Sequence, residues 1–223
     1  METVLIALPC LLALAAAGVV MGRMPAGRAV VYGGCLVLCV ALLVAGIVAM
    51  SAPVAHIALP LGLPPVGMTL RVDPLSAFFL ALTGLGGAGA SLFAIGYGRH
   101  EHEPARVLPF YPAFLAGMVL VVAADDAFVF LFGWELMSLA SWALVMAEHQ
   151  KPENARAGFV YLVMAAFSGF ALLLCFGVLS GIAGYGFDAM RAAPPVGLAA
   201  SVAMVLALIG AGAKAGLMPL HVW

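Results

Sequence analysis

Charged side chains are scarce in this chain of 223 residues: 9 Lys and Arg with 10 Asp and Glu make up only 9% of it. Soluble domains carry about 25% charged residues, which would be roughly 55 here. So few charges cannot cover a water-soluble globule, so a soluble enzyme is excluded. The net charge of −1 leaves too little positive charge to bind nucleic acid. Because 65% of the residues are hydrophobic, intrinsic disorder is excluded, and an integral membrane protein in a lipid bilayer is predicted.

Metal and cofactor motifs are also lacking. The G-x-G-x-x-G pattern of Gly84–Gly89 falls in mid-span and not between a strand and a helix, so we interpret its glycines as helix-packing contacts. The loop Arg99–Glu103 holds two histidines but has no second ligand cluster, and we interpret it as solvated. We expect no metal site and no cofactor in this chain. The cysteines lie in apolar stretches without metal-ligand spacing, which indicates small buried residues: Cys10, Cys35, Cys39 and Cys175.

Charges and prolines divide the sequence into apolar segments of about 20 residues, the length that crosses a bilayer as a helix. Prolines between residues 51 and 72 predict an extended or hairpin-like loop outside the lipid. The predicted fold is therefore all-α and membrane-integral, with residues 1–98 holding three helices and the external loop, and residues 107–223 holding four more. The expected spans are residues 3–22, 29–50, 73–98, 107–124, 126–147, 157–181 and 196–223.

Basic residues in the loops predict the orientation. Two lie on one side, Arg71 and Arg191. Because basic loops stay in the cytoplasm, we expect the N-terminus outside and the chain in the inner, cytoplasmic membrane. Six lie on the other side: Arg23, Arg28, Arg99, Arg106, Lys151 and Arg156.

Two charged residues fall inside predicted spans. Glu135 lies nine residues into its span, and Lys214 lies deep in the last one. A charge at the bilayer centre costs about 2.5–3.5 kcal/mol even on the lenient insertion scale, and such residues are commonly functional. The alternative is a static ion pair that only fixes helix packing.

The sequence around Lys214 predicts that the seventh helix is discontinuous. Residues 210–216 are glycine or alanine apart from the lysine, so neighbouring helices can approach closely and the backbone deforms easily at Gly212 and Gly216. Pro219 removes a further helical hydrogen bond. Membrane transporters build ion sites from interrupted helices of this kind.

Glu135, Ser138 and Leu139 share one face of the predicted fifth helix, which we expect to point into the bundle. Glu135 would then meet Lys214. Pairing with a carboxylate favours the charged form of a lysine. A lysine that separates from its carboxylate therefore gives up its proton more readily. The pair thus predicts a proton gate. His221, two turns beyond Lys214, could extend the proton path toward the cytoplasm, or could be a polar helix end.

Asp125 and Asp126 come directly before the fifth helix. Carboxylates at a helix N-terminus stabilise the helix dipole, which is the interpretation we favour. The alternative is a role in proton release to the outside.

Three segments together resemble a known family. They are LRVDPLSAFF at residues 70–79, GWELMSLASW at residues 133–142 and GAKAGLMPLHVW at residues 212–223. The chain is similar, from about Leu63 onward, to the antiporter-like subunits of respiratory complex I. More specifically, it resembles the large membrane subunit of the hydrogenase-4 and formate hydrogenlyase group.

The resemblance implies proton translocation driven by electron transfer in partner subunits. It pairs the fifth-helix glutamate with the seventh-helix lysine, here Glu135 and Lys214, and it implies a broken seventh helix. Family members often carry a Thr-His pair on the sixth helix where this chain has residues 165–167 as Ala-Ala-Phe, so no relay is expected there. Members also continue for several more helices, so we expect a truncated chain.

The predicted function is that of a proton-translocating membrane subunit of a redox-driven complex, partnered by other membrane and peripheral redox subunits. We expect no catalysis by this chain alone. The alternatives are a subunit of a multi-subunit cation/proton antiporter and a membrane anchor without transport. Measurements of proton and sodium flux separate the redox-driven subunit from the antiporter subunit. Substitution of Glu135 or Lys214 tests the membrane anchor.

Overall fold

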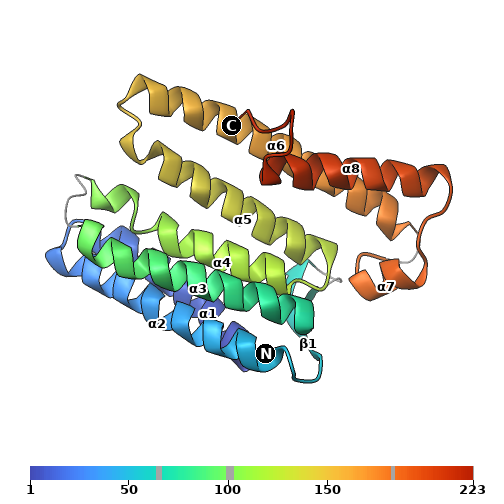
Figure 1. The fold of residues 1–223 in the computed structure, drawn as a ribbon, viewed down its shortest axis with the longest axis horizontal. Helices are drawn as coiled ribbons and strands as arrows, with labels where there is room; N and C mark the ends of the chain where they lie inside the picture. Colours follow the sequence, from blue (N-terminus) through green and yellow to red (C-terminus); the bar gives the residue numbers. More distant parts are fainter. Residues whose placement is uncertain (64–66, 99–102, 182–183, 223) are drawn as a thin grey trace.

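The computed structural model describes residues 1–63, 67–98, 103–181 and 184–222, and most of these are helical (Figure 1). In the described part of the chain, seven helices are long and apolar enough to cross a membrane, which confirms the predicted fold class. The elements are α1 (Glu2–Met21), α2 (Pro25–Ala49), β1 (Ala55–Leu63), β2 (Gly67–Val72), α3 (Pro74–Tyr97), η2 (Pro104–Arg106), α4 (Phe110–Ala123), α5 (Ala127–Val145), η3 (Met146–Glu148), α6 (Pro152–Ser180), α7 (Phe187–Ala192) and α8 (Leu198–Ala215).

Helix α6 departs most from the prediction. It begins at Pro152, five residues earlier than expected, because a proline at the first turn suits a helix start. Glu153 and Arg156 therefore belong to the helix and not to the loop. At 29 residues α6 is about 43 Å long, which exceeds the roughly 30 Å of hydrocarbon, so one end extends beyond the apolar layer. Residues 99–102 of the loop that we interpret as solvated lie outside the described residues.

The proline-rich stretch after α2 forms an antiparallel hairpin, as predicted. Strands β1 and β2 pair from Ala55 opposite Val72 to Leu59 opposite Met68, and the register is irregular toward the turn. The hairpin also contacts the α4–α5 connection, where the Asp125 N–H donates to the Thr69 carbonyl at 3.0 Å.

Asp126 caps α5 and ties the hairpin to it. Its carboxylate accepts hydrogen bonds from the Val129 N–H at 2.8 Å, the Thr69 N–H at 2.9 Å and the Thr69 hydroxyl at 2.6 Å. The side chain is only 2% exposed. The interpretation of this aspartate as a helix cap is confirmed.

Asp125 lies at the centre of a group of charges beside the hairpin. His56 Nε2 is 3.2 Å from its carboxylate, Arg191 Nη2 is 3.7 Å away and Arg71 Nη1 is 3.9 Å away. Burial and the nearby charge of Asp188 raise the pKa of Asp125, while Arg71, His56 and Arg191 oppose this shift. The group joins β1, β2 and α7 to the start of α5. Its role in proton release stays a prediction.

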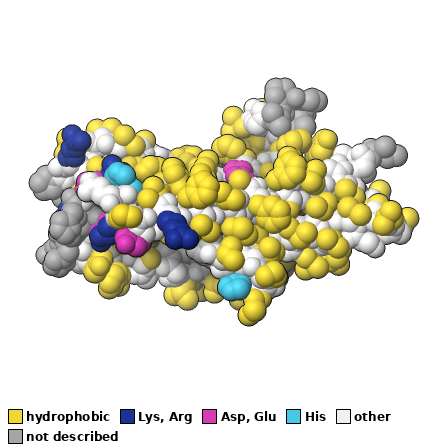
Figure 2. All heavy atoms as spheres, turned by 90° about the horizontal axis from the view of Figure 1, so that it is seen from above, with side chains coloured by type: hydrophobic (Ala, Val, Ile, Leu, Met, Phe, Trp, Pro, Cys, Tyr) yellow, Lys and Arg dark blue, Asp and Glu magenta, His cyan; other side chains and the backbone are white. Residues whose placement is uncertain are grey.

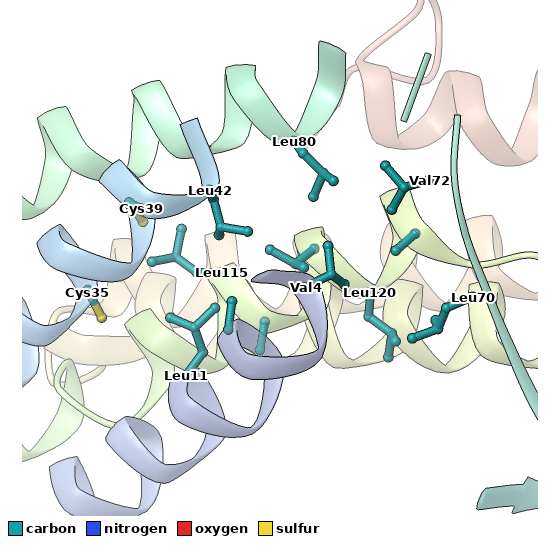
Figure 3. Packing of buried hydrophobic residues seen from close by; sticks show 14 of the residues in the cluster. Val4, Leu11, Cys35, Cys39, Leu42, Leu70, Val72, Leu80, Leu115 and Leu120 are labelled. Carbon is teal, nitrogen blue, oxygen red and sulfur yellow. The ribbon is translucent and has the colours of Figure 1, made fainter. Parts of the chain in front are cut away.

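The hydrophobic core lies where α1, α2, α3 and α4 meet the hairpin (Figure 3). Leu11 of α1, Leu42 of α2 and Leu115 of α4 converge in its centre, each at most 3% exposed. Within a membrane, close packing of such side chains stabilises the bundle, because lipid is as apolar as the core.

The glycines of the G-x-G-x-x-G pattern lie in α3 against α2. A Cβ at Gly84 would collide with the Cys39 carbonyl, and one at Gly87 would collide with the Cys39 sulfur, whereas Gly86 and Gly89 face open space. The helix-packing interpretation is confirmed for the first pair, which brings α2 and α3 close together.

The surface is that of a membrane protein. Figure 2 shows hydrophobic side chains over most of one face, with most of its charged side chains gathered toward one end. Large apolar residues are exposed on the helices, such as Val37, Phe93 and Phe170, each at least 61% exposed. The helices lie side by side (Figure 1), and α4 packs against both α1 and α5. The contact between α4 and α1 joins the two parts, residues 1–98 and residues 107–223, into which we expect the chain to be divided. That division stays a prediction.

Asp126→Ala should lower the free energy of unfolding by about 2–4 kcal/mol, because it removes a helix cap and leaves buried hairpin donors without a partner. The matched control is Asp73→Ala, which removes a more exposed cap that accepts from the Ser76 N–H at 2.9 Å and lies 3.4 Å from the Arg71 guanidinium. That control should cost about 1 kcal/mol. Unfolding by SDS in detergent micelles measures both, and equal losses would contradict the anchoring role of Asp126.

Candidate functional site

Helices α5, α6 and α8 form the part of the bundle that holds both membrane-embedded charges. Helix α8 runs along α6, and α6 packs against α5 (Figure 1). Small residues bring them together: a Cβ at Gly210 of α8 would press on Leu172 and on the Ser168 carbonyl of α6. Close approach of this kind is how membrane helices associate.

A buried hydrogen-bonded chain crosses the three helices. Trp134 Nε1 of α5 donates to the Ser168 hydroxyl at 3.2 Å, and this hydroxyl donates to the Gly210 carbonyl of α8 at 2.7 Å. Ser168 is fully buried. The chain fixes the spacing of the helices around the charged residues.

Lys214 lies at the end of α8, where the predicted helix break occurs. The helix ends at Ala215, and Gly216 adopts φ 76° and ψ 33°, in the left-handed region that favours glycine. The N–H groups of Gly216 and Leu217 both donate to the Gly212 carbonyl, as in a glycine-terminated helix end.

Gly212, Gly216 and Pro219, the three residues predicted to break the helix, have different roles in the structure. Gly212 lets the Leu217 side chain fold back, because a Cβ there would lie 3.0 Å from it. Gly216 turns the chain out of the helix. Pro219 comes four residues after Ala215, the last residue of the helix, so the glycine and not the proline terminates α8.

The Lys214 ammonium is held by neutral oxygen atoms. Its Nζ atom donates to the Ser138 hydroxyl of α5 at 3.0 Å and to the Tyr161 hydroxyl of α6 at 2.9 Å. It lies 5.2 Å from the centre of the Tyr161 ring, beyond the hydroxyl end of the side chain. Tyr161 is hydrogen-bonded in turn to Ser141, and the Ser141 hydroxyl donates to the Ser138 carbonyl at 3.1 Å.

Glu135 lies one helical turn before Ser138 on α5 and is half-buried. Its carboxylate rests against Gly169 of α6, where any Cβ would overlap it. Lys214 acts on Glu135 through its charge. In the part of the chain that the structure describes, however, no direct ion pair within 4 Å joins the two, because the lysine is bound to Ser138 and Tyr161. A direct Glu135–Lys214 contact stays a hypothesis.

The remaining predicted residues are less closely involved. Ser138 is 1% exposed, as expected of an inward face, but Leu139, expected beside it, is 51% exposed and points away. His221 follows the end of α8 in a non-helical, exposed segment. Its place on a proton path stays a prediction.

Sequence reasoning missed Tyr161, Ser141 and Ser168. The expected start of α6 at residue 157 put Tyr161 in the first turn, near the membrane surface. Only Ser141 left a signal that could have been used, since Glu135, Ser138 and Ser141 follow each other at intervals of three on one side of α5.

The chain is similar to subunits of membrane complexes. Residues 124–223 match the family described as NADH:quinone oxidoreductase/Mrp antiporter, TM. An uncharacterized protein of Mycobacterium tuberculosis is 40% identical over 178 residues, which is 80% of this chain and 28% of the relative. Hydrogenase-4 component B of Escherichia coli is 36% identical over 162 residues, which is 70% of this chain and 24% of the relative.

A solved structure has the same fold. A chain of the membrane-bound sulfane sulfur reductase, an archaeal respiratory membrane complex, matches with a TM-score of 0.81 at 17% identity, over 100% of this chain and 47% of its own length. The fold and site define a multi-pass membrane protein. The chain belongs to the antiporter-like membrane subunit family of respiratory complex I, hydrogenase-4 and Mrp complexes. It spans about a quarter of the length of the curated relatives it matches.

Ser168→Ala should lower the free energy of unfolding by about 1–3 kcal/mol, because the Trp134 indole and the Gly210 carbonyl both lose their buried partner. The matched control on the same helix is Ser180→Ala, whose hydroxyl donates only to the Gly177 carbonyl one turn away. It should cost less than about 1 kcal/mol. Unfolding in detergent micelles measures the difference, and a smaller loss at Ser168 than at Ser180 would contradict the bridging role.

Proposed function

We propose that this chain is part of a proton-translocating membrane subunit of a redox-driven complex, with Lys214 and Glu135 as a proton gate. One observation carries the proposal. The Lys214 ammonium lies in an apolar bundle and is bound by the neutral hydroxyls of Ser138 and Tyr161, and the Glu135 carboxylate lies one helical turn before Ser138 on α5. A static structural pair would place the opposite charges in direct contact. Two separate positions for one cation are what a gate requires.

The family supports this assignment, since its description joins NADH:quinone oxidoreductase and Mrp antiporter subunits. The relative named Hydrogenase-4 component B favours an oxidoreductase setting. We propose that other membrane subunits and peripheral redox subunits are the partners, and that electron transfer in them drives the gate. The redox cofactors would then belong to those partners.

In mechanism, the proton is carried as the lysine ammonium. When Lys214 contacts Glu135, the carboxylate stabilises the ammonium and holds the proton. When the lysine withdraws to Ser138 and Tyr161, it loses the full opposite charge and keeps only neutral acceptors. The proton is then released more readily, and the direction of release is set by which side of α8 is open to water.

Lys214→Met and Glu135→Gln should each abolish donor-driven proton uptake while the complex still assembles. The measurement uses everted membrane vesicles with the full-length protein in its complex, a dye that reports the pH difference, and formate, hydrogen and NADH as donors in turn. The matched controls are Lys151→Met and Glu148→Gln, which remove an exposed ion pair beside η3. These should leave uptake unchanged, because surface pairs contribute little.

Three outcomes would oppose the proposal. Unchanged assembly and uptake in both site variants would indicate an anchor without transport. Sodium flux in place of proton flux, independent of every donor, would indicate a cation/proton antiporter. Loss of uptake in the control variants as well would show that the buried site is not what determines transport.

We also propose that the N-terminus is external and that the chain lies in the inner, cytoplasmic membrane. Lys151→Cys should then react with a membrane-impermeant maleimide only in everted vesicles, and Ser51→Cys only in intact cells with a permeable outer layer. Both positions are exposed, and a Cys10→Ser background removes the exposed native thiol. The reverse pattern of labelling would overturn the orientation.

A further inference from the structure

We infer that Tyr161 is a positioning residue that holds Lys214 in its withdrawn position, away from Glu135, and thereby sets the pH range in which the gate works. This inference rests on the proposed function and deepens it. No sequence motif pointed to Tyr161, and only the packing of α6 against α8 brings it to the lysine.

The hydrogen bonds around Tyr161 run in one direction. The ammonium can only donate, so the Tyr161 oxygen accepts from Lys214 at 2.9 Å. The single Ser141 hydrogen is already given to the Ser138 carbonyl at 3.1 Å. Either hydroxyl can be the donor in the bond between Tyr161 and Ser141. We infer that the phenol donates, because the Ser141 hydrogen is assigned to the Ser138 carbonyl. Each bond in this directed chain strengthens the acceptor oxygen before it, so the chain as a whole favours a positive charge on Lys214.

The ammonium is held at the hydroxyl end of Tyr161. The Lys214 Nζ atom lies 2.9 Å from the hydroxyl oxygen and 5.2 Å from the ring centre, so it lies beyond the oxygen and not over the ring face. Tyr161 thus offers the ammonium an oxygen acceptor. Ser138 supplies the other acceptor at 3.0 Å. Two of the three ammonium hydrogens are occupied in this way, and the third is left for another acceptor.

The path back to Glu135 is short. Glu135, Ser138 and Ser141 are spaced by three residues on α5, which corresponds to about 4.5 Å along the axis per step. Lys214 is the penultimate residue of α8, two residues before a left-handed glycine, so a small change at the helix end moves its long side chain along this row. Tyr161 lies at the end of the row opposite to Glu135 and competes with it for the lysine.

Few other groups influence this competition. Among the described residues that contact Lys214 or act on it, the titratable ones are Glu135 from α5 and Tyr161 from α6. Met164, Ala165 and Ala213, which line the small space beside the lysine, are apolar. The choice between the carboxylate and the phenol therefore decides where the ammonium lies.

Tyr161→Phe tests the inference in the assembled complex, through the pH profile of donor-driven proton uptake. The variant removes the acceptor oxygen but keeps the ring, so the withdrawn ammonium is less stabilised and loses its proton at lower pH. The alkaline limb of the profile should move to lower pH by about one unit. Tyr161→Leu, which lacks the same acceptor oxygen, should move it in the same direction. Ser141→Ala should move it in the same direction by less.

The matched control is Tyr111→Phe, which deletes a phenol that is bound to Ser91 and the Gly87 carbonyl on the other side of the bundle. Its profile should coincide with that of the unmodified complex, although it also loses internal hydrogen bonds. A shift of equal size in this control would assign the effect to structure alone and overturn the inference.

The outcomes separate the inference from the proposed function. An unchanged profile in Tyr161→Phe, with uptake abolished in Lys214→Met, would overturn the positioning role and leave the gate standing. Retained uptake in Lys214→Met would overturn the gate itself. If Tyr161→Phe fails to assemble, Ser141→Ala decides: a shifted profile supports the directed chain, and an unchanged one overturns it.

Discussion

The site depends on the cost of placing one ammonium group inside an apolar helical bundle. An unpaired charge there is expensive, so the surrounding helices must supply acceptors at short distance. Ser138 and Tyr161 do so from two different helices. Neutral acceptors stabilise the cation less than a carboxylate does, which leaves the lysine bound but able to move.

The architecture around Lys214 follows from this requirement. Gly210 and Ser168 bring α8 close to α6. Gly169, also on α6, makes room for the Glu135 carboxylate of α5. Gly216 ends α8 two residues after Lys214, so the lysine side chain extends from a helix end and not from the middle of the helix. At the other end of α5, buried Asp126 fixes the helix to the hairpin, so that α5 offers a firm row of oxygen atoms to a mobile side chain.

Much of the fold could be predicted from the sequence because hydropathy and proline placement are local signals. They gave the seven spans and the hairpin, and the scarcity of charge drew attention to Glu135 and Lys214. The partners of Lys214 could not be found in this way, because a hydroxyl on another helix leaves no pattern near the lysine. Tyr161 was hidden further by the early start of α6 at Pro152. Likewise, the backbone conformation of Gly216, and not the more conspicuous Pro219, ends α8.

The central claim is that Lys214 moves between two positions, and structures of the complete complex at rest and during turnover test it most directly. We predict that the Lys214 Nζ atom lies within hydrogen-bonding distance of Tyr161 in one state and of Glu135 in the other. A lysine that stays on Tyr161 in both states, or that contacts Glu135 in both, would contradict the account.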